Sequence, residues 1–406
     1  MSTPLRSVTN DVPPVLPGSA ALDDLIAAIT ADAEARDRGE IGAQPAVDLL
    51  KRARFGAFRI PRAEGGGGAS LVELFEAVIR LAEADSNIPH IVRNHLAFVE
   101  KALRTRDNAK YRHWLRLSAA GNLFGLGASE LGVQHIGKGN GATVLERRGD
   151  AYVLNGRKYY STGNHYGDYI FVYAYTPAGE PVAAMVPVGR DGVDTTDDWD
   201  GIGQRLTASG TTTFTAVHVA PDEVIHQGEE DLKLPFEATF PQIYLTAIIT
   251  GILRAIVRDG ADLLRGRGRN YYHAVDPVPA NDPLLQQTIG RLSSLAYVAE
   301  AAVLRAVEAL GRAQDSAEAG HPDPALYREA SLRAAKAKVV LDELSIAAAG
   351  QLFDVGGASA ARQATRLDRH WRNIRTLSSH NPVAYKARAI GAYVIDGSPL
   401  PNASFF

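Results

Sequence analysis

The hydrophobic period of this chain changes twice along its length, and these changes limit the folds that it can adopt. Apolar side chains recur at helical spacing between residues 20 and 120. From about 121 to 230, short runs rich in β-branched and aromatic residues replace that pattern, and turn signals separate them. Helical spacing returns from Pro241 onward. The chain therefore predicts a β-rich segment between two helical regions.

The β-rich segment predicts an antiparallel structure. Its strand-like runs follow one another without the intervening helices that a doubly wound parallel sheet requires. Asn155-Gly156 lies between two such runs, and this dipeptide is a strong hairpin signal. The stretch from Pro177 to Gly179 marks a further turn. We therefore expect a small antiparallel barrel or sandwich.

Four long amphipathic segments follow the β-rich region, and short connections join them. In sequence order they span 242–268, 284–315, 324–352 and 382–395. Such a succession predicts an up-and-down four-helix bundle. The expected fold class is α+β and mostly α, with a flexible arm, an N-terminal helical domain, a central antiparallel β-barrel domain and a C-terminal four-helix bundle. The expected bounds of these four parts are 1–19, 20–120, 121–235 and 236–406.

Composition excludes several classes of protein. The 406 residues are 46% hydrophobic and carry a formal net charge of −3, so we exclude wholesale disorder and expect neither nucleic acid nor a membrane as partner. Ile243 to Val257 is the longest apolar candidate, but Thr250 and Arg254 interrupt it, and it predicts a buried helix. The N-terminal arm has no apolar leader segment, so we expect a cytoplasmic protein.

Sulfur is scarce in this chain, which contains 0 Cys and 2 Met. Without Cys, disulfides, thiolate metal sites and a Cys nucleophile are excluded. No metal site is expected, because His90 and His95 are five residues apart and do not share a helix face cleanly. Scarce Met is less usual, since Met is a useful gap-filler in cores. One explanation is that the protein is made when the cell lacks sulfur.

Four segments combine glycine with small hydroxyl and aromatic residues, the composition expected where backbone packs against a flat ligand. They span 126–132, 155–163, 198–205 and 369–376, and His380-Asn381-Pro382 follows the last of them. No Rossmann or P-loop glycine motif accompanies them. Each segment alone is more often a structural turn than a site, so the interpretation depends on their order and spacing.

In order and spacing these segments resemble the acyl-CoA dehydrogenase superfamily over nearly the whole chain. Ala128-Ser129-Glu130 is similar to the family's Ala-Leu-Thr-Glu segment, and the stretch from Tyr160 to Gly163 is similar to its Trp-Ile-Thr-Asn segment. Residues 203–209 are similar to its Gly-x-Arg-x-Ser/Thr turn. The resemblance implies the expected domain order, usually in a homotetramer, with flavin between the β domain and the bundles of two subunits.

One departure from the family changes the expected reaction. Acyl-CoA dehydrogenases abstract a proton with a Glu, often in a Tyr-Glu-Gly-Thr segment after an Arg-Asp-x-Arg phrase. Here the phrase is Arg369-His370-Trp371-Arg372, and the chain has no carboxylate between Asp368 and Asp396. The His-Asn-Pro ending at 380–382 instead resembles the flavin-dependent monooxygenase branch of the superfamily, which includes sulfur-acquisition enzymes.

That branch implies a two-component monooxygenase. A separate NAD(P)H-dependent flavin reductase supplies reduced FMN, which is expected in place of FAD by this resemblance alone. O2 then gives a C4a-hydroperoxyflavin, which transfers one oxygen atom to a small organosulfur substrate. Water destroys such a species, so the resemblance also implies an apolar and closed cavity.

The resemblance also implies roles for individual side chains. His380 would protonate the departing oxygen, and His95 would help to activate oxygen or to orient the substrate. Arg269 would reach the flavin phosphate from a neighbouring subunit. The side chains expected at the cofactor are Ser129, Tyr160, Thr162, Trp199, Ser209, Arg269, Ser359 and Arg369. Structural alternatives stay open: a helix cap at His380, a satisfied buried histidine at His95, and a solvated helix end at Arg269.

Other functions also stay open. The same fold could hydroxylate nitrogen or carbon, could be an acyl-CoA dehydrogenase with a displaced base, or could be a flavin-free binding module. The expected cavity walls lie around residues 90–99, 236–244 and His380. These stretches are apolar with few charges, so they predict an uncharged or weakly polar ligand.

Overall fold

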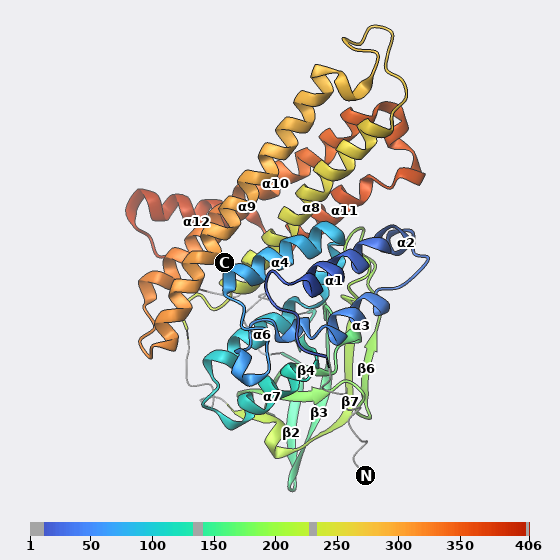
Figure 1. Ribbon diagram of the computed structural model, residues 1–406. Helices are drawn as coiled ribbons and strands as arrows, with labels where there is room; N and C mark the ends of the chain where they lie inside the picture. The colour runs from blue at the N-terminus through green and yellow to red at the C-terminus, as the bar shows by residue number, and fades with distance from the viewer. Residues whose placement is uncertain (1–11, 133–140, 227–233, 403–405) are drawn as a thin grey trace.

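The computed structural model describes residues 12–132, 141–226, 234–402 and 406. The chain is mostly helical and carries one mixed β-sheet (Figure 1). Helices α1 to α7 span Ala20–Ala31, Ala33–Arg38, Gln44–Arg52, Leu71–Ala84, Asn87–Ile91, Arg93–Arg104 and Ala109–Ala119. Helices α8 to α12 span Thr239–Gly266, Pro283–Glu318, Pro324–Gly356, Asp368–Ser378 and Val383–Asp396.

Helix α4 shows how the sequence starts its N-terminal helices. Ser70 is its N-cap: the Ser70 hydroxyl accepts from the backbone N–H of Glu73, and the Glu73 carboxylate accepts from the backbone N–H of Ser70 at 2.7 Å. This capping box satisfies two N–H groups that a helix start otherwise leaves unpaired, a contribution of about 1 kcal/mol. The predicted helix from Leu71 to about Ala84 is confirmed.

The sheet is mixed and open. Strands β1 to β8 span Phe124–Gly127, Val144–Arg148, Ala151–Lys158, Tyr169–Tyr175, Pro181–Pro187, Val193–Thr196, Thr211–Val219 and Val224–His226. They lie in the order β6-β7-β3-β2-β4-β5-β8, and β1 pairs with β4 off this path. Strands β1 and β2 both run parallel to β4. The expected closed antiparallel barrel is therefore wrong in detail, because long excursions of the chain, which permit parallel pairing, separate β4 from both strands.

The expected hairpin at Asn155-Gly156 is also wrong. Both residues lie inside β3, where the pairing with β7 shifts register between Leu154 and Gly156. The side chain of Asn155 accepts a hydrogen bond from Ala216 N at 2.8 Å. Gly156 has φ 153°, and a Cβ there would lie 2.6 Å from Cα of Thr143. The glycine therefore permits a β-bulge and the close approach of Thr143. In the sequence, a bulge of this kind has the same composition as a turn.

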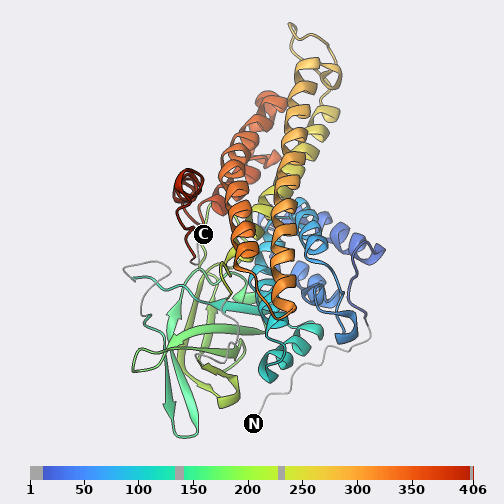
Figure 2. The same cartoon turned by 90° about the vertical axis from the view of Figure 1, so that its left-hand side faces the viewer.

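The C-terminal helices pack along one another. Helices α8, α9 and α10 contact each other in pairs, α11 contacts α8 and α10, and α12 contacts α10. In Figure 2 the long helices extend well beyond the rest of the molecule. The sequence predicts α8, α9, α10 and α12 but not α11. Helix α8 is long and apolar enough to cross a membrane, yet 83% of its most apolar window is buried in the protein, which confirms the predicted buried helix.

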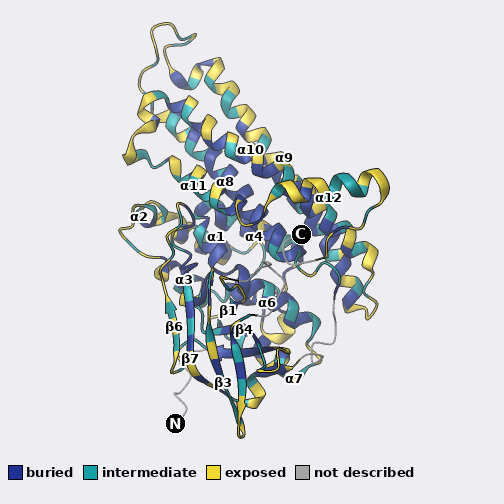
Figure 3. Cartoon of the chain, turned by 180° about the vertical axis from the view of Figure 1, so that it is seen from behind, coloured by how far each residue is buried: buried dark blue, intermediate teal, exposed yellow. Residues whose placement is uncertain are grey.

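Two apolar cores meet at α6. One core joins the N-terminal helices to α8, α9 and α10, and it includes Leu96 of α6. The other joins α6 and α7 to the sheet, and it includes Phe98 and Val99 of α6. Figure 3 shows the buried residues concentrated where the helices and the sheet come together. The first turn of α6 is therefore held rigidly between both halves of the molecule.

Candidate active site

The four glycine-rich segments form one connected network. Tyr159 N donates to Ser129 O at 2.9 Å and joins the second segment to the first. Ser161 N donates to Gly210 O at 3.0 Å and Gly163 N donates to Thr207 O at 3.1 Å, which joins the second segment to the residues directly after the third. Gln204 N donates to Asn373 Oδ1 at 2.7 Å and joins the third segment to the fourth. Gly203 packs so closely on α11 that a Cβ would lie 2.1 Å from the carbonyl oxygen of Arg372. The network therefore connects the end of β3 and the start of β7 to α11.

Small hydroxyl groups gather at the centre of this network. The Ser209 Oγ atom lies 2.8 Å from Thr162 Oγ1 and 2.7 Å from Thr207 Oγ1, and all three residues are buried. Asn94 of α6 donates to Thr162 O at 3.1 Å, which fixes this cluster against the first turn of α6. Two predicted site residues, Thr162 and Ser209, are thus in direct contact.

Two large aromatic side chains border the same network on the solvent side. Tyr160 is 62% exposed and has φ 55°, and its ring centroid lies 6.3 Å from that of Trp199 at 78°. Trp199 Nε1 donates to Gln204 O at 2.9 Å. Ser129 is exposed on the neighbouring segment. These residues form an open face with aromatic walls beside the hydroxyl cluster.

His380 lies between α11 and α12. Its Nε2 atom is 3.4 Å from Nη1 of Arg93, the first residue of α6. Packing of protein atoms around the imidazole, followed by the charge of Arg93, lowers the pKa of His380 well below its usual value, although the residue keeps an exposed surface. His380 is therefore neutral at pH 7, and Arg93 donates to Nε2, so the ring hydrogen is assigned to Nδ1.

His90 is a member of the site to which the sequence analysis gives no chemical role, only a place in the expected cavity wall. It is buried on α5, and its Nδ1 atom lies 2.9 Å from Oε1 of Gln204. The Gln204 amide donates to Ser86 Oγ at 2.9 Å, so its oxygen faces His90 and accepts the Nδ1 hydrogen. Burial, and then the charge of Arg93, lowers the pKa of His90 to about 3. The spacing of three residues between His90 and Arg93 is the signal that could have identified it.

Both ring nitrogens of His95 contact backbone groups. Its Nδ1 atom accepts from Phe124 N at 3.0 Å, and its Nε2 atom donates to Gly56 O at 3.0 Å. The residue is 1% exposed and its ring stacks on Phe124. Burial lowers the pKa of His95 to about 4. Both nitrogens are used by backbone groups, so the geometry favours the structural alternative for His95.

Arg269 and Ser359 lie away from the hydroxyl cluster. Both are exposed, Arg269 in the loop after α8 and Ser359 just after α10. Arg267 Nη1 donates to Val355 O at 2.7 Å and joins these two regions. Figures 1 and 2 show this end of the helices opposite the sheet. One chain alone does not bring these residues to Thr162.

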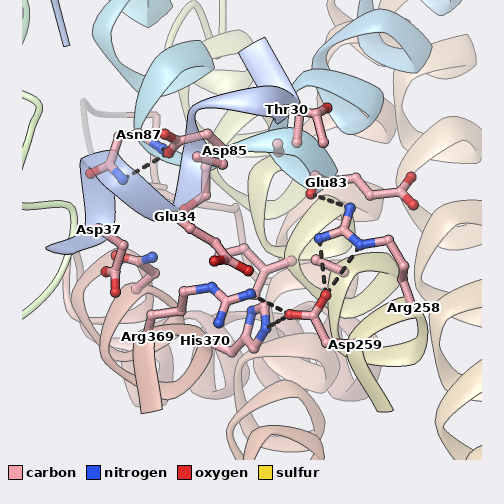
Figure 4. A pocket seen from close by; sticks show the side chains of 17 residues that line it. Thr30, Glu34, Asp37, Glu83, Asp85, Asn87, Arg258, Asp259, Arg369 and His370 are labelled. Carbon is pink, nitrogen blue, oxygen red and sulfur yellow. Dashed lines mark hydrogen bonds and ion pairs between the residues drawn. The ribbon is translucent and has the colours of Figure 1, made fainter. Parts of the chain in front are cut away.

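Arg369 forms an ion pair with Asp259 of the same chain. It lines a cavity of about 200 Å³ between α2, α4, α8 and α11, where its guanidinium pairs with Asp259 (Figure 4). His370 Nε2 lies 2.8 Å from the same carboxylate. Burial opposes ionisation of Asp259, but the hydrogen bond from His370 and the charges around it hold its pKa well below the usual range. Arg369 therefore fastens α11 to α8 within the described chain.

Comparison with known proteins shows what this chain is similar to. The family description "Acyl-CoA dehydrogenase, C-terminal domain" matches residues 243–385. The solved structure of FMN-bound TdsC from Paenibacillus sp. A11-2 is similar with a TM-score of 0.86 and 27% identity, and the match covers 95% of this chain and 100% of that chain. The chain is therefore similar to the acyl-CoA dehydrogenase family in its C-terminal part and to TdsC over nearly its whole length. The predicted resemblance is confirmed.

Two curated proteins match most of the chain. Dibenzothiophene monooxygenase of Mycolicibacterium goodii is 29% identical over 357 residues, which cover 84% of this chain and 85% of that protein. The probable FMNH2-dependent monooxygenase SfnC of Pseudomonas putida is 28% identical over 378 residues, which cover 90% of this chain and 92% of that protein. Both relatives bear the names of monooxygenases.

Proposed function

We propose that this chain is a monooxygenase that uses reduced FMN and O2 to oxygenate a small organosulfur compound in sulfur acquisition. The observation that carries the proposal is that Arg93, the first residue of α6, contacts His380 and that its charge also acts on the buried His90 of α5. Among the described residues, His90 and Arg93 have no hydrogen bond or ion pair with a carboxylate, so neither stands beside the base that a dehydrogenase needs. The names of the two relatives support the same reaction.

The residues of the network fit a flat, polar-edged cofactor such as FMN. The hydroxyl of Ser161 is buried and has no hydrogen-bond partner in the described part of the chain, and exposed Tyr160 stands next to it. When bound, reduced FMN supplies the activation of O2. We assign Tyr160 and Trp199 to packing on the ring system. We assign hydrogen bonding at its edge to the hydroxyls of Ser129, Thr162 and Ser209.

The site holds its protons at defined atoms. His380 carries its hydrogen at Nδ1, because Nε2 accepts from Arg93. His90 carries its hydrogen at Nδ1 and presents Nε2 as an acceptor, because Gln204 takes the Nδ1 hydrogen. One oxygen atom of O2 leaves as water, so the reaction needs proton donors and acceptors at fixed positions. We propose that His380 donates and that His90 accepts in this exchange.

The separation of Arg269 and Ser359 from the network supports an assembly of several copies. We propose a homotetramer in which a neighbouring chain brings both residues to the cofactor. Exposed apolar side chains on α9 and α12 offer surface for such contacts, namely Tyr297, Val298, Tyr385, Val394 and Ile395. The division into four parts with a C-terminal four-helix bundle, and a cytoplasmic location, stay part of this proposal.

A separate flavin reductase is required, because the proposed reaction consumes reduced FMN and the relative SfnC is named as FMNH2-dependent. We propose that the reductase uses NAD(P)H. The scarcity of sulfur in the chain supports a role when sulfur is limiting, so the abundance of the protein should rise when sulfate is withheld from the cells.

The direct test is turnover with reduced FMN, O2 and a panel of sulfides, sulfinates, amines and carbon acids. Oxygen incorporated from labelled O2 into a sulfur compound supports the proposal. Oxygenation confined to amines or carbon acids overturns the substrate class. Anaerobic bleaching of bound oxidised flavin by an acyl-CoA would instead establish a dehydrogenase and overturn the whole proposal.

A further inference from the structure

Lys158 and Glu130 form a buried ion pair next to the exposed face of the candidate site. Lys158 is the last residue of β3, and its Nζ atom lies 2.6 Å from Oε1 of Glu130. The two side chains are only 2% and 7% exposed. The Lys158 Nζ atom also donates to Ala128 O at 3.4 Å. The pair therefore joins the segment that carries Ser129 to the segment that carries Tyr160.

The Glu130 carboxylate uses both of its oxygens. Oε1 accepts from Lys158 Nζ and from Thr143 N at 3.2 Å, and Oε2 accepts from Ala142 N. A Cβ at Gly141 would lie 2.5 Å from Oε1, so the carboxylate packs closely against the backbone there. One side chain thus holds the end of β3 and the residues that lead into β2.

A backbone hydrogen bond joins the same two segments. Tyr159 N donates to Ser129 O at 2.9 Å. One such bond fixes a single point of contact and leaves the segments free to turn about it. The two contacts of Lys158 described above add further points, so that spacing and relative rotation are both restrained. Ser129 and Tyr160 are therefore held in one arrangement by groups that lie outside the exposed face.

Stability alone does not account for an ion pair at this place. Desolvation of two charges offsets much of their attraction, so apolar side chains of similar size often stabilise a core equally well. Burial opposes ionisation of Glu130, but the hydrogen bond from Lys158 and those from the backbone hold its pKa below the usual value. The pair supplies direction, because a buried ammonium has one favourable place, in contact with its carboxylate.

We propose that Lys158 and Glu130 are positioning residues for the cofactor: their ion pair fixes Ser129 relative to Tyr160, and this arrangement determines how tightly FMN binds. The role requires no contact between the pair and the cofactor, because Ser129 and Tyr160 are the exposed members of the two segments. The inference rests on the proposed function, since it takes the FMN of that reaction as the ligand. Neither residue is among the side chains that the sequence predicts at the cofactor.

Binding of FMN to the full-length protein tests the proposal. Quenching of flavin fluorescence measures the Kd of oxidised FMN, and coupled turnover gives the KM of reduced FMN. Glu130→Gln removes the charge and keeps the shape, and Lys158→Met removes the ammonium and keeps an unbranched stem. Each should weaken FMN binding by about 10-fold, the lower end of the usual loss when a group that orients a ligand-binding residue is removed. The KM of reduced FMN should rise alike, with kcat at saturation unchanged.

The double variant Glu130→Gln/Lys158→Met separates positioning from stability. Each single variant leaves one charge buried without its partner, so thermal unfolding should show a lowered Tm. The double variant has no unpaired charge, so its Tm should return toward that of the wild type. Its FMN affinity should stay about 10-fold below the wild type, because the two side chains act as one unit and their effects do not add.

Glu146→Gln is the matched control, since it removes the carboxylate of an exposed ion pair with Arg148 on β2. FMN affinity should not change in this variant. Where a single variant fails to fold, the double variant still decides, because it carries no buried charge at either position.

Three results would overturn the inference: wild-type FMN affinity in the folded single variants, an affinity of the double variant that recovers with its Tm or falls by about 100-fold, or an equal loss in Glu146→Gln. Failure of the proposed function looks different. FMN binding that depends on the pair, without oxygenation of any compound, would remove the monooxygenase and leave the positioning pair. Oxygenation with one KM for reduced FMN in the wild type and all variants would keep the enzyme and remove the pair.

Discussion

The Nδ1 atom of His90 lies 2.9 Å from Oε1 of Gln204, and this contact connects α5 to the segment before β7. Because Gln204 also donates to Ser86, its amide cannot turn to present a donor without losing a second hydrogen bond. The side chain of Gln204 thus fixes which nitrogen of His90 carries the hydrogen. Burial and the charge of Arg93 keep the ring neutral, although this hydrogen bond acts in the opposite direction, because the amide oxygen adds no negative charge.

Replacing that amide by a carboxylate should change the protonation of His90. In Gln204→Glu the new charge favours the imidazolium, so the pKa of His90 should rise from about 3 toward its ordinary value. Titration of the ring protons by NMR measures this directly. Coupled turnover should fall, because a protonated ring no longer accepts at Nε2. An unmoved titration curve in the folded variant would contradict the contact.

His380→Ala should uncouple flavin oxidation from oxygenation. Without the Nδ1 donor, reduced FMN should still react with O2, but the product should fall by about 100-fold while hydrogen peroxide accumulates. Parallel assays of peroxide and oxygenated product measure the effect. Ser379→Ala is the matched control, because Ser379 is exposed and its hydroxyl only donates to Arg375 O at 2.8 Å. Undiminished coupling in His380→Ala would remove this residue from the mechanism.

His95 should make the fold sensitive to acid. Its pKa is about 4 in the folded protein and about 6.5 unfolded, so below pH 6.5 the unfolded chain binds more protons. The contribution of His95 to stability is therefore complete above pH 6.5 and is lost as the pH falls toward 4, by about 2 kcal/mol at pH 5.

Denaturant unfolding at pH 7 and pH 5 measures that contribution. His95→Gln should lose less stability between the two values than the wild type does, although it starts lower, because glutamine does not titrate. His113→Gln, at an exposed position of α7, should keep the wild-type dependence. Equal pH dependence in His95→Gln and the wild type would show that His95 does not stay neutral in the folded state.

Sequence pattern predicts most of the elements here, because each buries a face with its own period. It does not predict closure of the sheet, since parallel pairing of β1 with β4 depends on where distant segments return. Asn155-Gly156 has the composition of a turn, but the nearby backbone of Thr143 makes it a bulge. Helix α11 is short and mostly polar, and only Ile374 and Leu377 mark its buried face with aliphatic side chains, so the sequence gives little apolar signal for it.

The site shows a similar limit. The glycine-rich segments predict that residues such as Thr162 and Ser209 come together, because backbone that packs closely needs small residues. The roles of the histidines are harder to predict, because the sequence does not distinguish a ring whose nitrogens bond backbone groups from a ring that faces a cavity. His95 bonds Phe124 and Gly56, whereas His90 faces Arg93, and only the fold separates the two cases.

Removal of the Asp259 carboxylate should weaken the packing of α11 against α8. Its carboxylate receives His370 at 2.8 Å and the guanidinium of Arg369, both from the first turn of α11. In Asp259→Asn the charge is lost while Arg369 stays largely buried, so we expect about 2 to 4 kcal/mol of destabilisation by denaturant unfolding. Asp262→Asn, in an exposed pair with Arg265, should change stability by less than about 0.5 kcal/mol. If both variants unfold alike, Asp259 does not hold α11 in place.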